Sequence, residues 1–422
     1  MSSAPSTHAR LRLPALAAVL ALGLLLVPAV AWGGATPAPA STAPPTEEPT
    51  PSPTPTPTAT PAQTVTVAAS AATLTYGQEV TVSGVVQPAV AGQEVVVSLG
   101  GVRLGSAFTD ASGAFSLKVT PRKSGELVAK LADGTRSEAM RLVVKPKVSV
   151  SYGTPVPFAN VSLIVKVVPA EYSGTVTAVV SHRGVAVTTI KAATHNGRAV
   201  VQLPLRGVGA FPVELSLPSA DGFGARSAKA TVQVSDAKVS TGSSGPRVRA
   251  LLTQLDRLKF RVPYIGSTFN SQCADAVVAF QKAYGLSRDY VFGPQAWRKL
   301  ETATVIKARY SSPSTHLEVD KGRQIAMVVK NGAVYGIIAV STGATGNTPE
   351  GSFHIFVKSL YAPSNFGGQL FRSMGFYSDF AMHGYAPVPP YPASHGCVRE
   401  PMWVAQWMYD QSWVGEQLYI YH

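Results

Sequence analysis

One short segment near the C-terminus holds the residue types that covalent catalysis needs. Residues Ser394 to Arg399 spell Ser-His-Gly-Cys-Val-Arg, and Cys397 is one of only two cysteines in the chain. His383 stands fourteen residues before that cysteine. A free thiol has a pKa of about 8.5, so a nucleophilic cysteine needs a nearby base or a positive field. Either His383 or His395 can supply the base, and the pattern predicts a Cys/His acyl-transfer site.

Two other chemistries use the same residue types. Cys397, His395, His383 and His354 carry donors that zinc prefers, but the paired spacing of typical zinc sites is absent. Ser394 lacks the Gly-x-Ser-x-Gly turn that presents a serine nucleophile. We therefore favour the thiol as the nucleophile and expect neither a metal nor a cofactor.

Several segments follow one another in the order of a known family. His383-Gly384, a short loop and the Ser394 to Arg399 run resemble the signature of the L,D-transpeptidases of bacterial cell walls. The resemblance covers about residues 312–422, although the ten residues between His383 and Ser394 are fewer than the family usually has. Upstream segments that are similar to the family are Gln324 to Val329, Asn331-Gly332, Val340 to Gly343, and Thr348 to Phe353 with its Thr-Pro-x-Gly turn.

The resemblance implies a role for each residue of the site. Cys397 attacks the stem peptide with His383 as general base, D-alanine leaves, and a second stem resolves the thioester. The carbonyl of Gly384 orients His383, and backbone N–H groups hold the oxyanion. Arg399 stands where many members carry asparagine, and it either binds a substrate carboxylate or braces the loop. The remaining expected site residues are Gly396 as an oxyanion donor, Ser394 and His395 as shapers of the turn, and Tyr385 as a substrate contact.

Two other functions remain open at this point. The same Cys/His site can pass the thioester to water, which makes an L,D-carboxypeptidase. A second class of protein, a wall-binding or adhesive factor without catalysis, fits the domains that precede the site. The intact pair of Cys397 and His383 argues against the non-catalytic class.

The segments around the site predict a mostly β C-terminal domain over residues 309–422. Strands are expected near residues 325–330, 334–341, 352–357, 379–383 and 417–422. Pro401 is expected to open a helix, since proline suits the first helical turn. Cys397 would then lie just before the positive end of a helix, which favours a thiolate.

Before this domain, residues 246–302 predict a bundle of three short helices. Apolar residues recur at helical spacing from Arg247 to Leu258, and further helices are expected from about Ser271 to Tyr284 and through Trp297. Val277 to Gln281 and the run from Gly293 to Trp297 resemble a peptidoglycan-binding module. Cys273 begins the second helix and is expected to be a buried apolar residue rather than a ligand or disulfide partner.

Residues 63–236 show short stretches of period-two alternation separated by turn residues. This pattern is typical of antiparallel β-sandwiches. We predict two immunoglobulin-like sandwiches, over residues 63–146 and 147–236, followed by a Ser/Gly linker over residues 237–245. Neither sandwich contains residues that call for chemistry.

The N-terminal 62 residues predict export and a stalk. Residues 1–32 carry an apolar run from Leu13 to Trp32 behind two arginines, which fits a signal peptide or a single membrane anchor. Residues 33–62 are rich in proline and threonine and favour an extended polyproline conformation. The protein is therefore expected outside the cytoplasm, at the cell wall or on the outer face of the membrane.

The chain has a formal net charge of +13, and the charge is uneven. Residues 246–310 hold eleven Lys and Arg against four acids, whereas residues 311–422 are close to neutral. A basic surface can bind an acidic polymer. No nucleic-acid motif accompanies the charge, so the expected partners are peptidoglycan stem peptides and an anionic cell-wall polymer, and the alternative is an ordinary solvated surface.

Overall fold

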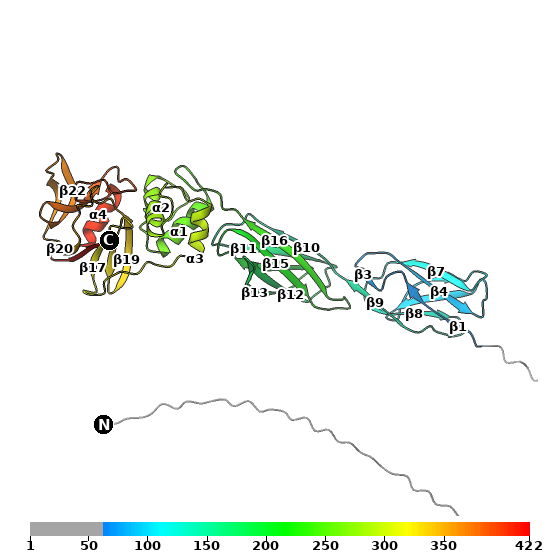
Figure 1. Cartoon of the computed structure of the whole chain (residues 1–422). Helices are drawn as coiled ribbons and strands as arrows, with labels where there is room; N and C mark the ends of the chain where they lie inside the picture. The colour runs from blue at the N-terminus through cyan, green and yellow to red at the C-terminus, as the bar shows by residue number, and fades with distance from the viewer. Residues whose placement is uncertain (1–61) are drawn as a thin grey trace, which may run out of the picture. The chain divides into compact units, whose positions relative to one another are not determined.

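The computed structural model describes residues 62–422, and Figure 1 shows their helices and strands. The predicted leader (residues 1–32) and all but the last residue of the predicted stalk lie outside the described residues. Among residues 62–422, no helix combines the length and the apolar character needed to cross a membrane.

The first β domain spans residues 64–145 and consists of two sheets around one core. One sheet has the order β1-β4-β2 with β7 paired to β4, and the other has the order β3-β9-β8-β5-β6. Alternation within β5 buries Val95, Val97 and Leu99. The strands are β1 (Thr64–Val65), β2 (Ala68–Ala69), β3 (Thr73–Thr75), β4 (Val80–Gln87), β5 (Glu94–Leu99), β6 (Val102–Phe108), β7 (Ala114–Val119), β8 (Gly125–Leu131) and β9 (Met140–Lys145).

The second β domain spans residues 147–234 and also consists of two sheets. Their strand orders are β10-β11-β14 and β13-β12-β15-β16. Period-two alternation therefore predicts the strands of both domains well, while their immunoglobulin-like character stays a prediction. The strands are β10 (Lys147–Tyr152), β11 (Asn160–Val168), β12 (Thr175–His182), β13 (Val185–Ala193), β14 (Arg198–Pro204), β15 (Gly209–Leu217) and β16 (Arg226–Val234).

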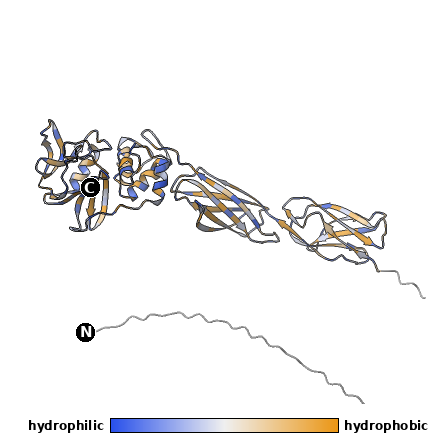
Figure 2. Cartoon of the chain, viewed as in Figure 1, coloured by the Kyte–Doolittle hydropathy of each residue, from blue (hydrophilic) through white to orange (hydrophobic). Residues whose placement is uncertain are grey.

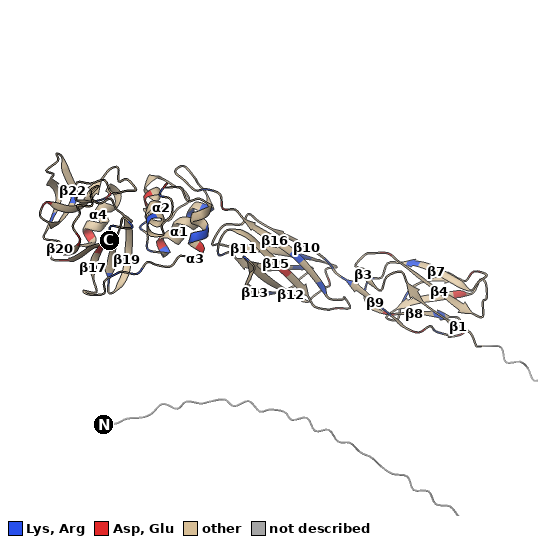
Figure 3. Cartoon of the chain, viewed as in Figure 1, with Lys and Arg blue, Asp and Glu red and all other residues tan. Residues whose placement is uncertain are grey.

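The helical bundle consists of α1 (Pro246–Arg257), α2 (Ser271–Ala283) and α3 (Pro294–Thr302). Proline opens α1 and α3, and the side chain of Asn270 caps α2 by accepting the N–H of Cys273 at 3.0 Å. Cys273 is fully buried, as expected of a core residue, and neither cysteine is in a disulfide. Figure 3 shows Lys and Arg side by side with fewer acidic residues on these helices, so the basic segment of the sequence forms the helical bundle.

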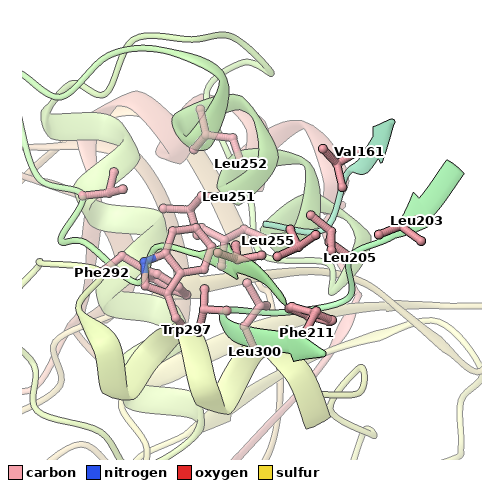
Figure 4. Close-up of a cluster of buried hydrophobic side chains, with 14 of the residues drawn as sticks. Val161, Leu203, Leu205, Phe211, Leu251, Leu252, Leu255, Phe292, Trp297 and Leu300 are labelled. Carbon is pink, nitrogen blue, oxygen red and sulfur yellow. The ribbon is translucent and has the colours of Figure 1, made fainter. Parts of the chain in front are cut away.

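The bundle shares a hydrophobic core with its neighbours in the chain. Figure 4 shows Leu205 and Phe211 of the second β domain near Leu255, Trp297 and Leu300 of the bundle. The same cluster continues into the apolar residues of β18 (Ile325–Lys330) and β19 (Ala333–Ala339). Figure 2 shows apolar and polar residues alternating along the strands and mixed along the helices.

The C-terminal domain is mostly β, as predicted. One sheet has the order β19-β18-β17-β25-β20, and the other has the order β21-β22-β23-β24. Helix α4 (Met402–Gln411) packs against β22, β23 and β24. The other elements are β17 (His316–Asp320), β20 (Gly351–His354), β21 (Val357–Pro363), β22 (Gln369–Tyr377), β23 (Phe380–Tyr385), β24 (Val398–Pro401) and β25 (Gln417–Tyr421).

Candidate active site

Cys397 lies just before β24 and is partly buried. Its sulfur is 4.0 Å from the carbonyl oxygen of Asp379 and accepts a hydrogen bond from the N–H of Ala381. Burial raises the pKa of the Cys397 thiol, and the Ala381 N–H opposes that effect only in part. The expectation of a helix-assisted thiolate is therefore wrong, because α4 begins at Met402 and β24 separates it from the thiol.

His383 lies on β23, the strand that also contacts the thiol. β23 and β24 are parallel neighbours, and His383 is in register with Arg399. The imidazole is 3 % exposed, and its Nδ1 lies 3.0 Å from the carbonyl oxygen of Gly384. A carbonyl only accepts hydrogen bonds, so Nδ1 carries the proton and Nε2 keeps a lone pair. Burial lowers the pKa of His383, and the bond to Gly384 opposes this shift.

A tight turn connects Ser394 to Cys397. Ser394 is buried, and its Oγ accepts the N–H of Gly396 at 3.1 Å while donating to the carbonyl oxygen of Cys397. Gly396 has φ +142°, and a Cβ there would lie 2.3 Å from the ring of Phe380. Only glycine fits this position. The N–H of Gly396 is already bonded to Ser394, which counts against its expected role as an oxyanion donor.

Two polar side chains that are not among the expected site residues bond to this turn. Thr348 is fully buried, and its Oγ1 donates to the carbonyl oxygen of Gly396 at 2.7 Å and accepts the N–H of Gly343 at 2.8 Å. Asn347 donates from Nδ2 to the carbonyl oxygen of His395 at 2.6 Å. The Thr-Pro-x-Gly motif that follows Asn347 marks this segment in the sequence. Its contact with the Ser394 to Cys397 turn depends on the tertiary fold and cannot be read from the motif.

Arg399, Tyr385 and His395 are the remaining expected site residues, and each has contacts of its own. The guanidinium of Arg399 lies over the ring of Tyr385 and donates to the carbonyl oxygen of Ala393 at 3.0 Å. His395 stacks on Phe366, with ring centroids 4.0 Å apart. Of the two histidines considered as base, His383 is thus buried on the strand beside the thiol, whereas His395 lies against an exposed aromatic side chain.

The site consists of a thiol and a buried imidazole held by neighbouring parallel strands. It lies in a mostly β domain that follows a small helical bundle. This combination indicates a cell-wall transpeptidase. Residues 314–420 match the family model of the L,D-transpeptidase catalytic domain, and residues 244–300 match that of a peptidoglycan binding domain. The chain belongs to the L,D-transpeptidase family.

Solved structures of transpeptidases also match the chain. An L,D-transpeptidase of Xylanimonas cellulosilytica is 31% identical over 45% of this chain and 100% of its own, with a TM-score of 0.43. One of Stackebrandtia nassauensis is 21% identical over 44% of this chain and 95% of its own, with a TM-score of 0.30. The comparison with curated proteins gave no match. The family assignment depends on the sequence matches.

Proposed function

We propose that this protein forms 3-3 cross-links between peptidoglycan stem peptides through a thioester on Cys397. The observation that carries the proposal is the 3.0 Å contact between Nδ1 of His383 and the carbonyl oxygen of Gly384, which assigns the tautomer of His383. Because Nδ1 donates to Gly384, Nε2 is the free base, and it belongs to the strand whose Ala381 N–H contacts the sulfur. That arrangement supports a thiol activated by an adjacent imidazole.

In the acylation step, Nε2 of His383 accepts the thiol proton as the sulfur attacks the carbonyl carbon of the diamino acid in a donor tetrapeptide. The S–C bond forms, and the C–N bond to the terminal D-alanine breaks. The proton passes from the imidazolium to the leaving amine. Because burial raises the pKa of the thiol and lowers that of the imidazole, we propose that proton transfer accompanies the attack and does not precede it.

In the second step, the side-chain amine of another stem attacks the thioester carbonyl. The new C–N bond replaces the S–C bond, and His383 takes a proton from the attacking amine and passes it to the leaving thiolate. We assign the oxyanion to the N–H of Cys397, because Ser394 already takes the N–H of Gly396. Attack by water in place of the amine gives the L,D-carboxypeptidase reaction.

The other domains support a place at the cell wall. The helical bundle belongs to a peptidoglycan binding family and is basic, so we assign it a role in holding the wall, with an anionic polymer as a further partner. The leader and the proline-rich stalk favour export with a cleaved signal or a retained anchor. Together these features support a reaction outside the cytoplasm.

Mass spectrometry of the products from a disaccharide tetrapeptide tests this function. We expect the full chain to release D-alanine, to acquire the mass of a thioester on Cys397, and to form a cross-linked dimer. Cys397→Ser should form neither the adduct nor the dimer. Loss of D-alanine without dimer would favour the carboxypeptidase. No turnover by the wild type, with peptidoglycan binding equal in Cys397→Ala, would favour the wall-binding factor.

A further inference from the structure

The loop over residues 386–393 connects β23 to the turn that bears Cys397. Four of its eight residues are proline, at positions 387, 389, 390 and 392. Proline has no N–H to donate, so this loop has few donors of its own for its backbone carbonyl groups. Donors from elsewhere in the molecule must therefore fix its path.

Four side chains supply those donors to four different carbonyl groups of the loop. Two of them, Arg399 and Ser341, belong to the C-terminal domain, whereas Arg288 and Tyr290 belong to the helical bundle. The bonds run from Tyr290 Oη to Val388 O at 3.1 Å, from Arg288 Nη1 to Pro390 O at 2.9 Å, from Ser341 Oγ to Tyr391 O at 2.8 Å, and from Arg399 Nη1 to Ala393 O at 3.0 Å.

The segment that carries Arg288 and Tyr290 is itself held in place by a buried amide. Gln281 on α2 is 2 % exposed, and its Nε2 donates to Asp289 Oδ1 at 2.7 Å and to Val291 O at 3.0 Å. Its Oε1 accepts the N–H of Tyr290 at 3.1 Å. All three bonds fix the α2–α3 connection, so Arg288 and Tyr290 reach the loop from a rigid base.

Helix α2 also bonds to the C-terminal domain through two further side chains. Lys282 is 1 % exposed and donates from Nζ to Val340 O at 2.7 Å, next to Ser341, whose backbone pairs with Arg399. Asp275 accepts the indole N–H of Trp403, on α4, at 2.9 Å. The bundle therefore contacts the framework of the site at several separate points.

We propose that Arg288 and Tyr290 are positioning residues of the active site: the helical bundle holds the loop over residues 386–393, which sets the position of the Ser394 to Cys397 turn. The bundle thus acts on the reaction as well as on wall binding. The kinetic consequence depends on the proposed transpeptidase function, while the structural consequence does not.

The test compares Tyr290→Phe and Arg288→Gln in the full chain with two matched controls. Tyr264→Phe also removes a tyrosine hydroxyl, but that hydroxyl donates to Thr268 O inside the bundle. Arg257→Gln removes an exposed charge on α1. Hydrogen exchange is measured at the amides of Ala393 and Ser394, which both donate to Thr342 O. Release of D-alanine gives kcat and KM.

Each lost bond is worth about 1 kcal/mol, or about fivefold. We expect Tyr290→Phe and Arg288→Gln to speed exchange at these two amides and to lower kcat/KM by about that factor. Arg288→Lys should recover part of both effects. Alkylation of Cys397 by iodoacetamide should not change, since this small reagent does not need the loop, and the controls should match the wild type.

Exchange equal to that of the controls overturns the proposal, and so does faster exchange with unchanged kcat/KM. A general loss of folding would speed exchange throughout the bundle and change alkylation, and that result also counts against a positioning role. If the wild type shows no turnover but the variants still exchange faster at Ala393 and Ser394, the transpeptidase function fails while the loop contact stands.

Discussion

The guanidinium carbon of Arg399 lies 4.0 Å from the centroid of the Tyr385 ring, across the parallel pair of β23 and β24. Arginine stacked on an aromatic ring and bonded to a loop carbonyl is held in one geometry. Of the two roles considered for Arg399, the contacts to Tyr385 and Ala393 favour bracing of the loop over capture of a substrate carboxylate.

Substitution of Arg399 separates these roles. We expect Arg399→Lys to lower kcat/KM by about tenfold, because lysine loses the planar stack and the bond to Ala393. The loss should be equal for a donor peptide that ends in D-alanine carboxylate and for the same peptide ending in the amide. A loss confined to the carboxylate donor would instead assign Arg399 to substrate binding.

The pH dependence follows from the two shifted pKa values. Burial raises the pKa of the Cys397 thiol, so alkylation by iodoacetamide should have a midpoint above the value of about 8.5 for a free thiol. Burial lowers the pKa of His383, so kcat/KM should persist below pH of about 6.5 as the imidazole stays neutral.

His383→Gln should lower kcat/KM by about 100-fold or more, while His354→Gln, at an exposed histidine, should change neither the alkylation profile nor the kcat/KM profile. An alkylation midpoint below the free-thiol value would reveal a resting ion pair instead.

Thr348 offers a test of the turn that holds Cys397. Thr348→Val keeps the shape but leaves the Gly343 N–H and the Gly396 carbonyl without their partner. Buried unpaired groups of this kind cost about 1–3 kcal/mol each. We expect thermal unfolding to shift down and kcat to fall at least tenfold, while Thr348→Ser, which keeps the hydroxyl, stays close to the wild type. Equal effects of valine and serine would mean that the methyl group matters more than the hydroxyl.

Glu416 makes stability depend on pH. Burial raises the pKa of this carboxyl to about 7. The folded chain therefore keeps a proton that the unfolded chain releases above pH of about 4.5, and the free energy of unfolding falls as pH rises from there to about 7. Glu416→Gln should be more stable than the wild type at pH 8 by about 1–2 kcal/mol, with the gap closing toward pH 4.5.

Urea unfolding at several pH values measures this gap. The exposed Glu350, paired with Lys321 at 3.1 Å, provides the control substitution Glu350→Gln, for which no such pH-dependent gap is expected. A difference between Glu416→Gln and the wild type that stays constant across pH would contradict the assignment.

Local patterns predict the helices well and the strands of the C-terminal domain less well. The helix bounds agree because proline and Asn270 mark the starts of α1, α2 and α3. The period-two pattern does not reveal β17, because its alternate residues His316, Glu318 and Asp320 are polar but buried. Glu318 accepts hydrogen bonds from the backbone N–H groups of Arg309 and Tyr310, from the ring of His316 and from the hydroxyl of Tyr421. No hydrophobic periodicity predicts these polar contacts.

In the candidate site, too, the sequence predicts some features, whereas others depend on contacts in the folded chain. The types and order of His383 and Cys397 are visible in the sequence, whereas the need for glycine at position 396 follows from its φ and from the nearby ring of Phe380. Thr348 contacts the cysteine turn and Tyr290 contacts the loop before it, and both contacts join segments that are far apart in the sequence. The direction of the thiol pKa shift also depends on burial, which spacing alone does not reveal.

The contact between the bundle and the loop limits how such domains can be exchanged in evolution. A recombination junction in the connector over residues 303–308 would separate Arg288 and Tyr290 from the carbonyl groups that they hold. A foreign bundle could still bind the wall, yet the loop would lose two of its four donors. Inheritance should therefore keep bundle and C-terminal domain together as one unit, while the first β domain, which has a core cluster of its own, is freer to be replaced.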